Sequence, residues 1–95
     1  MTALADDDAD ELLRALAHPA RREILRRCWA QPMPAGALAD VLDLAPASVS
    51  EHLKVLRKTG LAVLTPEGTF RRYRADPQRV AALAAWLATF PTDTS

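Results

Sequence analysis

The feature that most constrains the fold is an amphipathic helical segment that leads almost directly into two short β-forming runs. Residues 46–58 begin with a proline, which fits the first turn of a helix, and Gly60 follows as a candidate left-handed cap. The apolar positions of this segment keep the i, i+4, i+7 spacing of one helix face: Val49, Leu53 and Leu56. Residues 61–65 and 69–74 are rich in β-forming side chains, and residues 66–68 between them (Pro-Glu-Gly) predict a hairpin.

Four more helices are predicted from apolar periodicity and from prolines, which helix interiors exclude. They are expected at residues 6–17, 19–29, 35–42 and 77–90. Asp76 is expected to cap the last of them, and the inward residues of the third are predicted to be Leu38, Val41 and Leu42. The order α-α-α-α-β-β-α is mainly α with a small β-hairpin. Because a three-residue turn joins the third and fourth helices, the predicted fold is a winged helix-turn-helix.

The 95 residues are enough for one domain, residues 1–95, with residues 1–5 and 92–95 expected as frayed tails. A domain this short has a marginal core, so a partner subunit would add buried area. The longest apolar stretch, Val80 to Ala88, is too short to cross a bilayer, and no signal-peptide apolar run follows the acidic N-terminus. We therefore expect a cytoplasmic protein with no membrane partner.

Charge is distributed unevenly, although the formal net charge is zero. Residues 1–11 carry acids and no bases, whereas basic clusters occur in residues 12–34 and 61–95. Such clusters are either a solvated surface or the footprint of a nucleic-acid interface.

The outward face of residues 46–58 begins with small and hydroxyl-bearing side chains and ends with bases. Its members are Ala47, Ser48, Ser50, Glu51, Lys54, Arg57 and Lys58. Small residues near the N-terminus of a recognition helix let its backbone approach base edges in the major groove. Lys54 and Arg57 suit phosphates, which position a protein without reading sequence. His52 is interpreted either as a phosphate or base contact or as a satisfied interior histidine.

The second β-forming run adds three arginines. Because residues alternate faces along a strand, Arg72 and Arg74 share one face, and Arg71 and Tyr73 share the other. Tyr73 is expected to pack inward, and one or more arginines to lie along a DNA backbone or minor groove. The alternative is a hairpin that merely covers the core. The residues predicted to contact double-stranded DNA are Ala47, Ser48, Ser50, Glu51, His52, Lys54, Arg57, Arg71, Arg72 and Arg74.

Three separated segments carry a family resemblance: residues 16–25 (LAHPARREIL), 36–61 (GALADVLDLAPASVSEHLKVLRKTGL) and 67–74 (EGTFRRYR). In this order they resemble the ArsR family of winged-helix repressors, over roughly residues 10–90. The resemblance implies a homodimer built on the first and last helices, which binds an imperfect inverted repeat and usually represses a promoter.

The sequence departs from the metal-sensing members of that family. Those members carry a Cys-x-Cys pair at the start of the third helix, or Asp and His ligands on the last. Here residues 33–40 hold no cysteine, and no histidine follows Asp76. A transition-metal site needs about four converging ligands, whereas Cys28, His18 and His52 lie on three segments. We predict no metal site and no cofactor, as in the metal-independent, autorepressor-like branch; the sequence identifies no effector.

Two smaller departures fall in the predicted turn. Asp43 stands where family members usually have Gly, and Asp tolerates the left-handed region better than most residues. Ala45 stands where they tend to have Ser. An alanine N-cap costs about 0.5–2 kcal/mol, part of which Pro46 is expected to recover by presetting the first helical turn.

The apolar faces of the first and last helices have two interpretations, completion of a monomer core or a two-fold interface. The last helix is apolar nearly all round, which is typical of a helix covered on more than one side. The predicted dimer-interface residues are Leu12, Leu13, Leu16, Val80, Leu83 and Leu87.

Parts of the sequence suggest three alternative functions. Ser48, Ser50 and His52 raise the question of nucleophilic chemistry, but no carboxylate is placed to orient the imidazole, so no catalytic residue is predicted. Cys28 is expected to be a buried inert thiol rather than an exposed redox sensor. The rival to a DNA-binding regulator is a winged helix that docks an acidic protein and binds no specific DNA.

Overall fold

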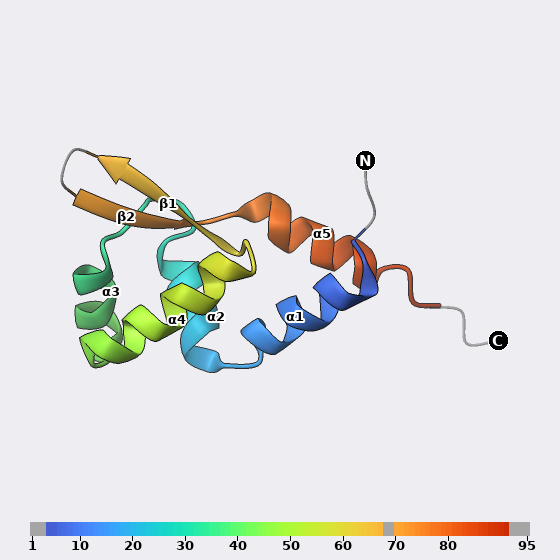
Figure 1. Cartoon of the computed structure of the whole chain (residues 1–95), viewed down its shortest axis with the longest axis horizontal. Helices are drawn as coiled ribbons and strands as arrows, with labels where there is room; N and C mark the ends of the chain where they lie inside the picture. Colours follow the sequence, from blue (N-terminus) through green and yellow to red (C-terminus); the bar gives the residue numbers. More distant parts are fainter. Residues whose placement is uncertain (1–3, 68–69, 92–95) are drawn as a thin grey trace.

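The structure is a computed structural model that describes residues 4–67 and 70–91. The described residues form five helices and two strands in the predicted order (Figure 1): α1 (Asp6–Leu16), α2 (Pro19–Arg27), α3 (Ala35–Leu42), α4 (Pro46–Lys58), β1 (Ala62–Glu67), β2 (Phe70–Ala75) and α5 (Pro77–Leu87). This confirms the winged helix-turn-helix prediction. Parts of the expected hairpin turn and of the expected tails lie outside the described residues, namely residues 68–69, 1–3 and 92–95. Leu4 packs against the core.

Several element boundaries differ from the prediction: α1 ends at residue 16 rather than 17, β1 begins at residue 62 rather than 61, and β2 spans residues 70–75 rather than 69–74. Helix α2 ends at Arg27 rather than Trp29, and α5 ends at Leu87 rather than Phe90. Strand β1 continues through Glu67, so it includes two residues that the Pro-Glu-Gly pattern had placed in the turn. In the described part of the chain, no helix is long and apolar enough to cross a bilayer.

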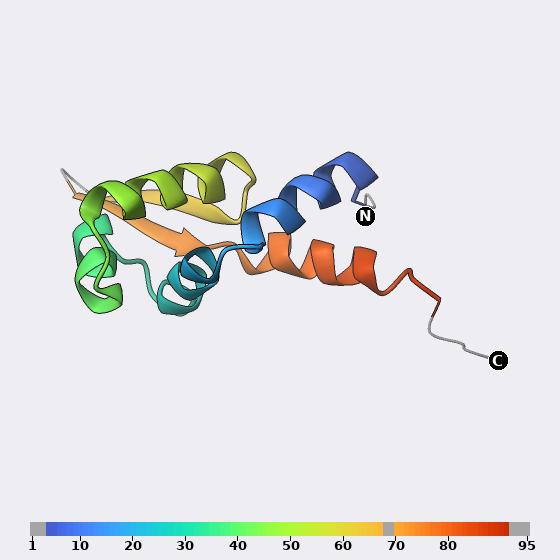
Figure 2. The same cartoon turned by 90° about the horizontal axis from the view of Figure 1, so that it is seen from below.

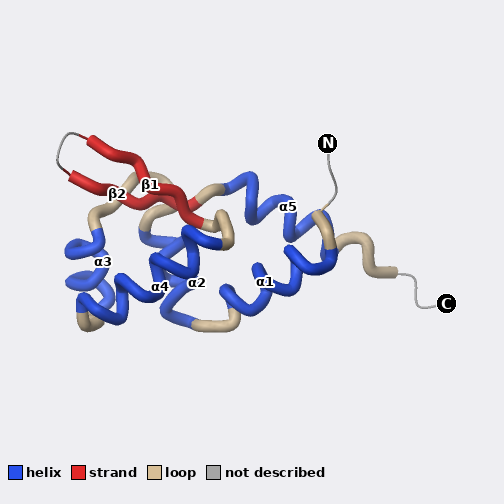
Figure 3. Tube along the Cα trace, viewed as in Figure 1, coloured by secondary structure: helices blue, strands red, loops and turns tan. Residues whose placement is uncertain are grey.

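The molecule is elongated, with principal dimensions of 53 × 27 × 22 Å. Helices α2, α3 and α4 and the hairpin form one end (Figure 1). Helices α1 and α5 lie side by side at the other end, as the perpendicular view also shows (Figure 2). β1 contacts α4, and β2 contacts α2 and α3, so the sheet covers the helix-turn-helix on one side (Figure 3).

The core is built around α2, which contacts α1, α3, α4 and β2. The large side chains that are fully buried come from nearly every element: Leu12, Ile24, Cys28, Leu38, Val49, Leu53, Leu56 and Leu61. The predicted inward position of Val41 is wrong, because its side chain is 48% exposed. On α3, Leu38 and the small Ala39 make the buried contacts instead. In a helix of eight residues, the i+3 and i+4 patterns fit nearly equally well, and packing decides between them.

The hairpin is tied to the helices through its backbone. β1 and β2 pair antiparallel, with Ala62 opposite Ala75. Tyr73 exchanges two backbone hydrogen bonds with Met33, at 2.8 and 2.9 Å, so the segment before α3 pairs with the outer edge of β2. The N–H of Ala75 also donates to the carbonyl of Cys28 at 3.1 Å. These bonds fix the position of the wing, which is the hairpin of β1 and β2, relative to α2 and α3.

Local sequence signals account for three chain reversals. Asp43 adopts φ 53°, in the left-handed region, as its place in the turn predicted. The N-cap of α4, Ala45, makes no side-chain hydrogen bond, and Pro46 follows at the first helical position. Asp76 accepts a hydrogen bond from the N–H of Gln78 at 3.0 Å, which confirms it as the cap of α5.

Two glycines provide a matched test of the turn after α4. Gly60 has φ 81°, and a Cβ there would lie 3.3 Å from Nε of Arg79, which donates to the Thr59 carbonyl. We expect Gly60→Ala to lower the free energy of unfolding by about 1–2 kcal/mol, the cost of a left-handed non-glycine residue. Gly36→Ala, in α3 with open space around it, is expected to raise the free energy by up to about 1 kcal/mol. Urea denaturation measures both, and equal effects would contradict the role of the backbone conformation.

Candidate nucleic-acid interface

The outer face of α4 is held in place by its buried face. Val49, Leu53 and Leu56 lie in the core, so the opposite side of the helix faces solvent. All the predicted outward residues are exposed: Ala47, Ser48, Ser50, Glu51, Lys54, Arg57 and Lys58. The N-terminal half of this face carries short side chains, so a binding partner can come close to the helix backbone there. The C-terminal half carries cations, which can bind an anionic partner.

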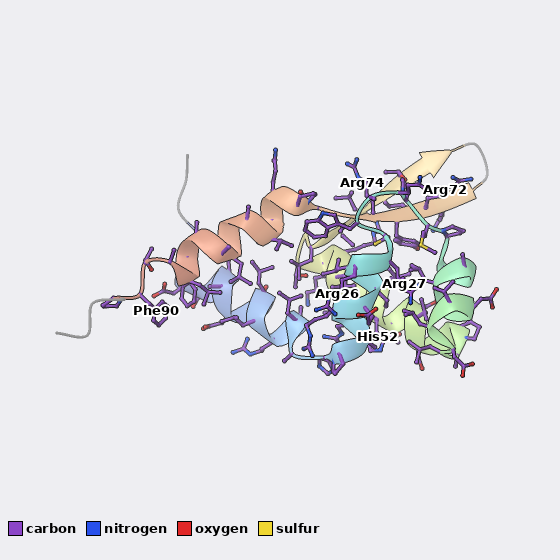
Figure 4. All side chains as sticks on the ribbon, turned by 180° about the vertical axis from the view of Figure 1, so that it is seen from behind. Arg26, Arg27, His52, Arg72, Arg74 and Phe90 are labelled. Atoms are coloured by element: carbon purple, nitrogen blue, oxygen red, sulfur yellow. The ribbon has the colours of Figure 1, made fainter. Side chains whose placement is uncertain are left out.

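Strand β2 carries the three arginines of the hairpin. Arg71, Arg72 and Arg74 of β2 are exposed, whereas Tyr73 is half-buried and packs against the core. Arg72 pairs with Thr65 and Arg74 with Val63 across the hairpin, so both lie on one face of the sheet (Figure 4). The predicted alternation of the wing residues is therefore present.

A groove of about 400 Å³ lies between α4 and β2. Its lining residues are Ser50, Leu53, Lys54, Arg57, Lys58 and Tyr73. The lining thus combines the aromatic ring of Tyr73 from β2 with the basic end of α4, and its polar side-chain groups are two hydroxyls, two ammonium groups and a guanidinium. Such a lining suits an anionic chain, because ammonium and guanidinium groups bind phosphate with charge-assisted hydrogen bonds.

The cations of the groove are not neutralised within the described chain. Lys54, Arg57 and Lys58 form no ion pair with any described residue, whereas Glu23 of α2 pairs with Arg26 at 2.7 Å and with Arg27 at 3.9 Å. A protein whose net charge is zero therefore carries an uncompensated positive stripe along α4. Charge of this kind steers and binds nucleic acid regardless of its sequence.

Comparisons with known proteins agree with this geometry. The sequence profile of a helix-turn-helix domain family matches residues 16–65. HTH-type transcriptional regulator Rv2034 of Mycobacterium tuberculosis is 41% identical over 83 residues, covering 87% of this chain and 78% of that protein. An ArsR-like transcriptional regulator from Rhodococcus sp. RHA1 superposes with a TM-score of 0.81 at 27% identity, covering 86% of this chain and 77% of the other. The chain belongs to the ArsR family.

A second solved structure, of a possible ArsR-family transcriptional regulator, shares this fold. Mb0332 from Mycobacterium bovis, described as a homodimeric winged helix-turn-helix DNA-binding domain, superposes with a TM-score of 0.73 over 93% of this chain and 88% of that fragment. At 23% identity, this similarity shows the fold alone. The present chain is thus an ArsR-type transcriptional regulator with a helix-turn-helix DNA-binding fold.

The structure brings together two histidines that the sequence had placed on separate segments. The rings of His18 and His52 lie 6.3 Å apart, and Nε of Arg21 donates to Nδ1 of His52 at 3.1 Å. Burial lowers the pKa of His52, as do the nearby charges of Arg21 and His18, while Glu51 acts in the opposite direction. The contact of Arg21 with His52 in this ArsR protein was not predicted from the sequence, because only the packing of α2 on α4 brings the two residues together.

Cys28 occupies the core, as expected. It is fully buried, and burial raises the pKa of its thiol. A redox sensor in this ArsR chain would need an exposed thiol with a lowered pKa, and Cys28 has neither property. The described residues also contain no group of three His, Cys, Asp or Glu side chains placed to hold a metal; the absence of a regulatory metal stays a prediction.

The residues predicted for an ArsR-type dimer interface divide into two groups. Leu12 and Leu83 belong to the core of the single chain, and Leu16 and Val80 are half-buried against it. The exposed members are Leu13 and Leu87, at 39% and 47%. Phe90, which follows α5, is 55% exposed and packs edge-on against Trp86 with a centroid distance of 5.2 Å. The indole N–H of Trp86 donates to Asp6 at 3.0 Å, which fastens α5 to α1.

Proposed function

We propose that this ArsR-type regulator is a repressor that binds an inverted-repeat operator as a homodimer. The observation that carries the proposal is the groove between α4 and β2, with cations that no described residue neutralises. In the proposed complex, α4 enters the major groove, Ser48 and Ser50 face base edges, and Lys54 and Arg57 bind phosphates. Arg71 and Arg74 of the wing follow the adjacent backbone or minor groove.

The homodimer is proposed from the α1–α5 end of the molecule. Leu13, Leu87 and Phe90 expose apolar surface there, and the related fold of Mb0332 is described as homodimeric. A two-fold axis at this end would place two copies of α4 on one side of the assembly. An inverted repeat is the DNA counterpart of such symmetry, with half-sites about one helical turn apart.

The remaining parts of the proposal rest on the amino-acid sequence. Residues 1–95 act as one domain in the cytoplasm, with no enzyme activity and no membrane partner. Because the cysteine pair of metal-sensing members is absent, the protein works without a metal or other cofactor. No residue set identifies a small-molecule effector.

A mobility shift with DNA from upstream of the protein's own gene, repeated across salt concentrations, tests the proposal. We expect specific binding that weakens steeply as salt rises, because each neutralised phosphate releases counterions. In vitro transcription from the same DNA should fall as protein is added, which separates repression from activation. Salt-insensitive binding to an acidic protein, with no preference among DNA sequences, would favour the docking-module alternative.

A further inference from the structure

The contact between Arg21 and His52 determines which nitrogen of the imidazole carries hydrogen. Arg21 lies in the first turns of α2 and His52 lies in α4, 31 residues later. A guanidinium only donates hydrogen bonds, so Nδ1 of His52 must be the acceptor and carry no proton. The neutral ring then carries its hydrogen on Nε2.

The Nε2 atom of His52 is open to solvent. Within the described residues, nothing accepts a hydrogen bond from it, and no buried side-chain nitrogen or oxygen lacks a partner. An unpartnered Nε2 in a half-buried residue is therefore an exposed one. His52 follows Ser48 by one helical turn, so it borders the exposed face of α4 on the side of α2 (Figure 4).

We propose that Arg21 is a positioning residue for DNA binding, which holds His52 as the Nε2–H tautomer so that α4 presents a fixed neutral donor to a backbone phosphate. This inference rests on the proposed function. The ring centre of His18, the N-cap residue of α2, lies 6.3 Å from that of His52. The charges that face His52 are Arg21 and His18 from α2 and Glu51 from α4 itself.

The alternative protonation states would lose this arrangement. Protonation at both nitrogens would keep the outward Nε2–H but would set Nδ1–H, on a charged ring, against the Arg21 guanidinium. The Nδ1–H tautomer would meet the same clash and leave Nε2 as an acceptor, which a phosphate cannot use. Of the two neutral tautomers, Arg21 thus selects the one that can donate to DNA, and burial favours a neutral ring as well.

The tautomer is tested in the free protein by NMR of histidine ring nitrogens at neutral pH. The unaltered protein is expected to show Nδ1 of His52 unprotonated and Nε2 protonated. Arg21→Ala is expected to give a mixture of tautomers. The matched control is Arg26→Ala, which removes the same charge from the same helix, where Arg26 pairs with Glu23. A protonated Nδ1 in the unaltered protein would overturn the inference while leaving the proposed function standing.

The role in binding is tested by a double-mutant cycle on the operator. Arg21→Ala is expected to weaken binding by roughly five- to tenfold, the effect of one hydrogen bond, and Arg26→Ala by less than about twofold. In a His52→Ala background, Arg21→Ala should have no further effect. An equal loss in both backgrounds would mean that Arg21 contacts phosphate itself and would overturn the positioning role. Failure of the unaltered protein to bind any DNA would instead refute the proposed function, whatever the tautomer.

Discussion

Replacing Lys54 and Arg57 together with alanine is expected to weaken operator binding by about a hundredfold at physiological salt. A dimer would lose four cations, and each phosphate contact contributes about 0.9 to the slope of log affinity against log salt. The slope should therefore fall by roughly three to four. Since neither side chain forms an ion pair with a described residue, thermal stability should change little. Fluorescence anisotropy across a salt series measures affinity and slope together.

The control for this pair is Arg26→Ala with Arg27→Ala. These arginines carry the same charge but pair with Glu23 on α2, away from the groove. We expect only the modest loss that follows from lower overall charge. If the two double variants weaken binding equally, general electrostatic attraction accounts for the effect, and the groove has no special part. Changes at Ser48 and Ser50 should instead alter base preference while the salt slope stays constant.

The chain reversals were predictable because their causes are local. Asp43 in the left-handed region, Gly60 after α4 and Asp76 at the start of α5 each follow from the conformational preference of a single residue type. The starts of α2, α4 and α5, each at a proline, are predictable for the same reason. Wherever one residue decides its own backbone conformation, the sequence is sufficient.

Features that depend on two distant segments were not predictable in this way. The inward face of α3 is set by contact with α2 and α4, so the periodic pattern alone wrongly buried Val41. The pairing of Met33 with Tyr73 uses backbone atoms that carry no signal in the side chains. The contact of Arg21 with His52 joins residues 31 positions apart. The outer face of α4 was predictable because its residues all lie on one helix. The contact that α2 makes with this face through Arg21 was not predictable, because it joins two helices.

Replacement of Leu87 by aspartate is expected to give a monomer whose operator affinity is lower by about a hundredfold or more. Leu87 is exposed at the α1–α5 end, as is Leu13, and both belong to the proposed interface. A carboxylate buried between two subunits without a partner is strongly disfavoured. Each monomer then binds a single half-site, and the gain from linking two binding events is lost. Light scattering at micromolar concentration measures the mass, and anisotropy measures the affinity.

Val41→Asp is the control, because Val41 is 48% exposed and Leu87 47%. The same charge is introduced at the same exposure on α3, outside the proposed interface, and the protein should stay dimeric. Leu12 and Leu83 are unsuitable sites for testing the interface. They lie in the core of the single chain, so replacing either of them with aspartate would unfold it. A dimeric Leu87→Asp variant would place the interface elsewhere. A monomeric variant with unchanged operator affinity would show that each subunit binds DNA independently, and the inverted repeat would then have no structural basis.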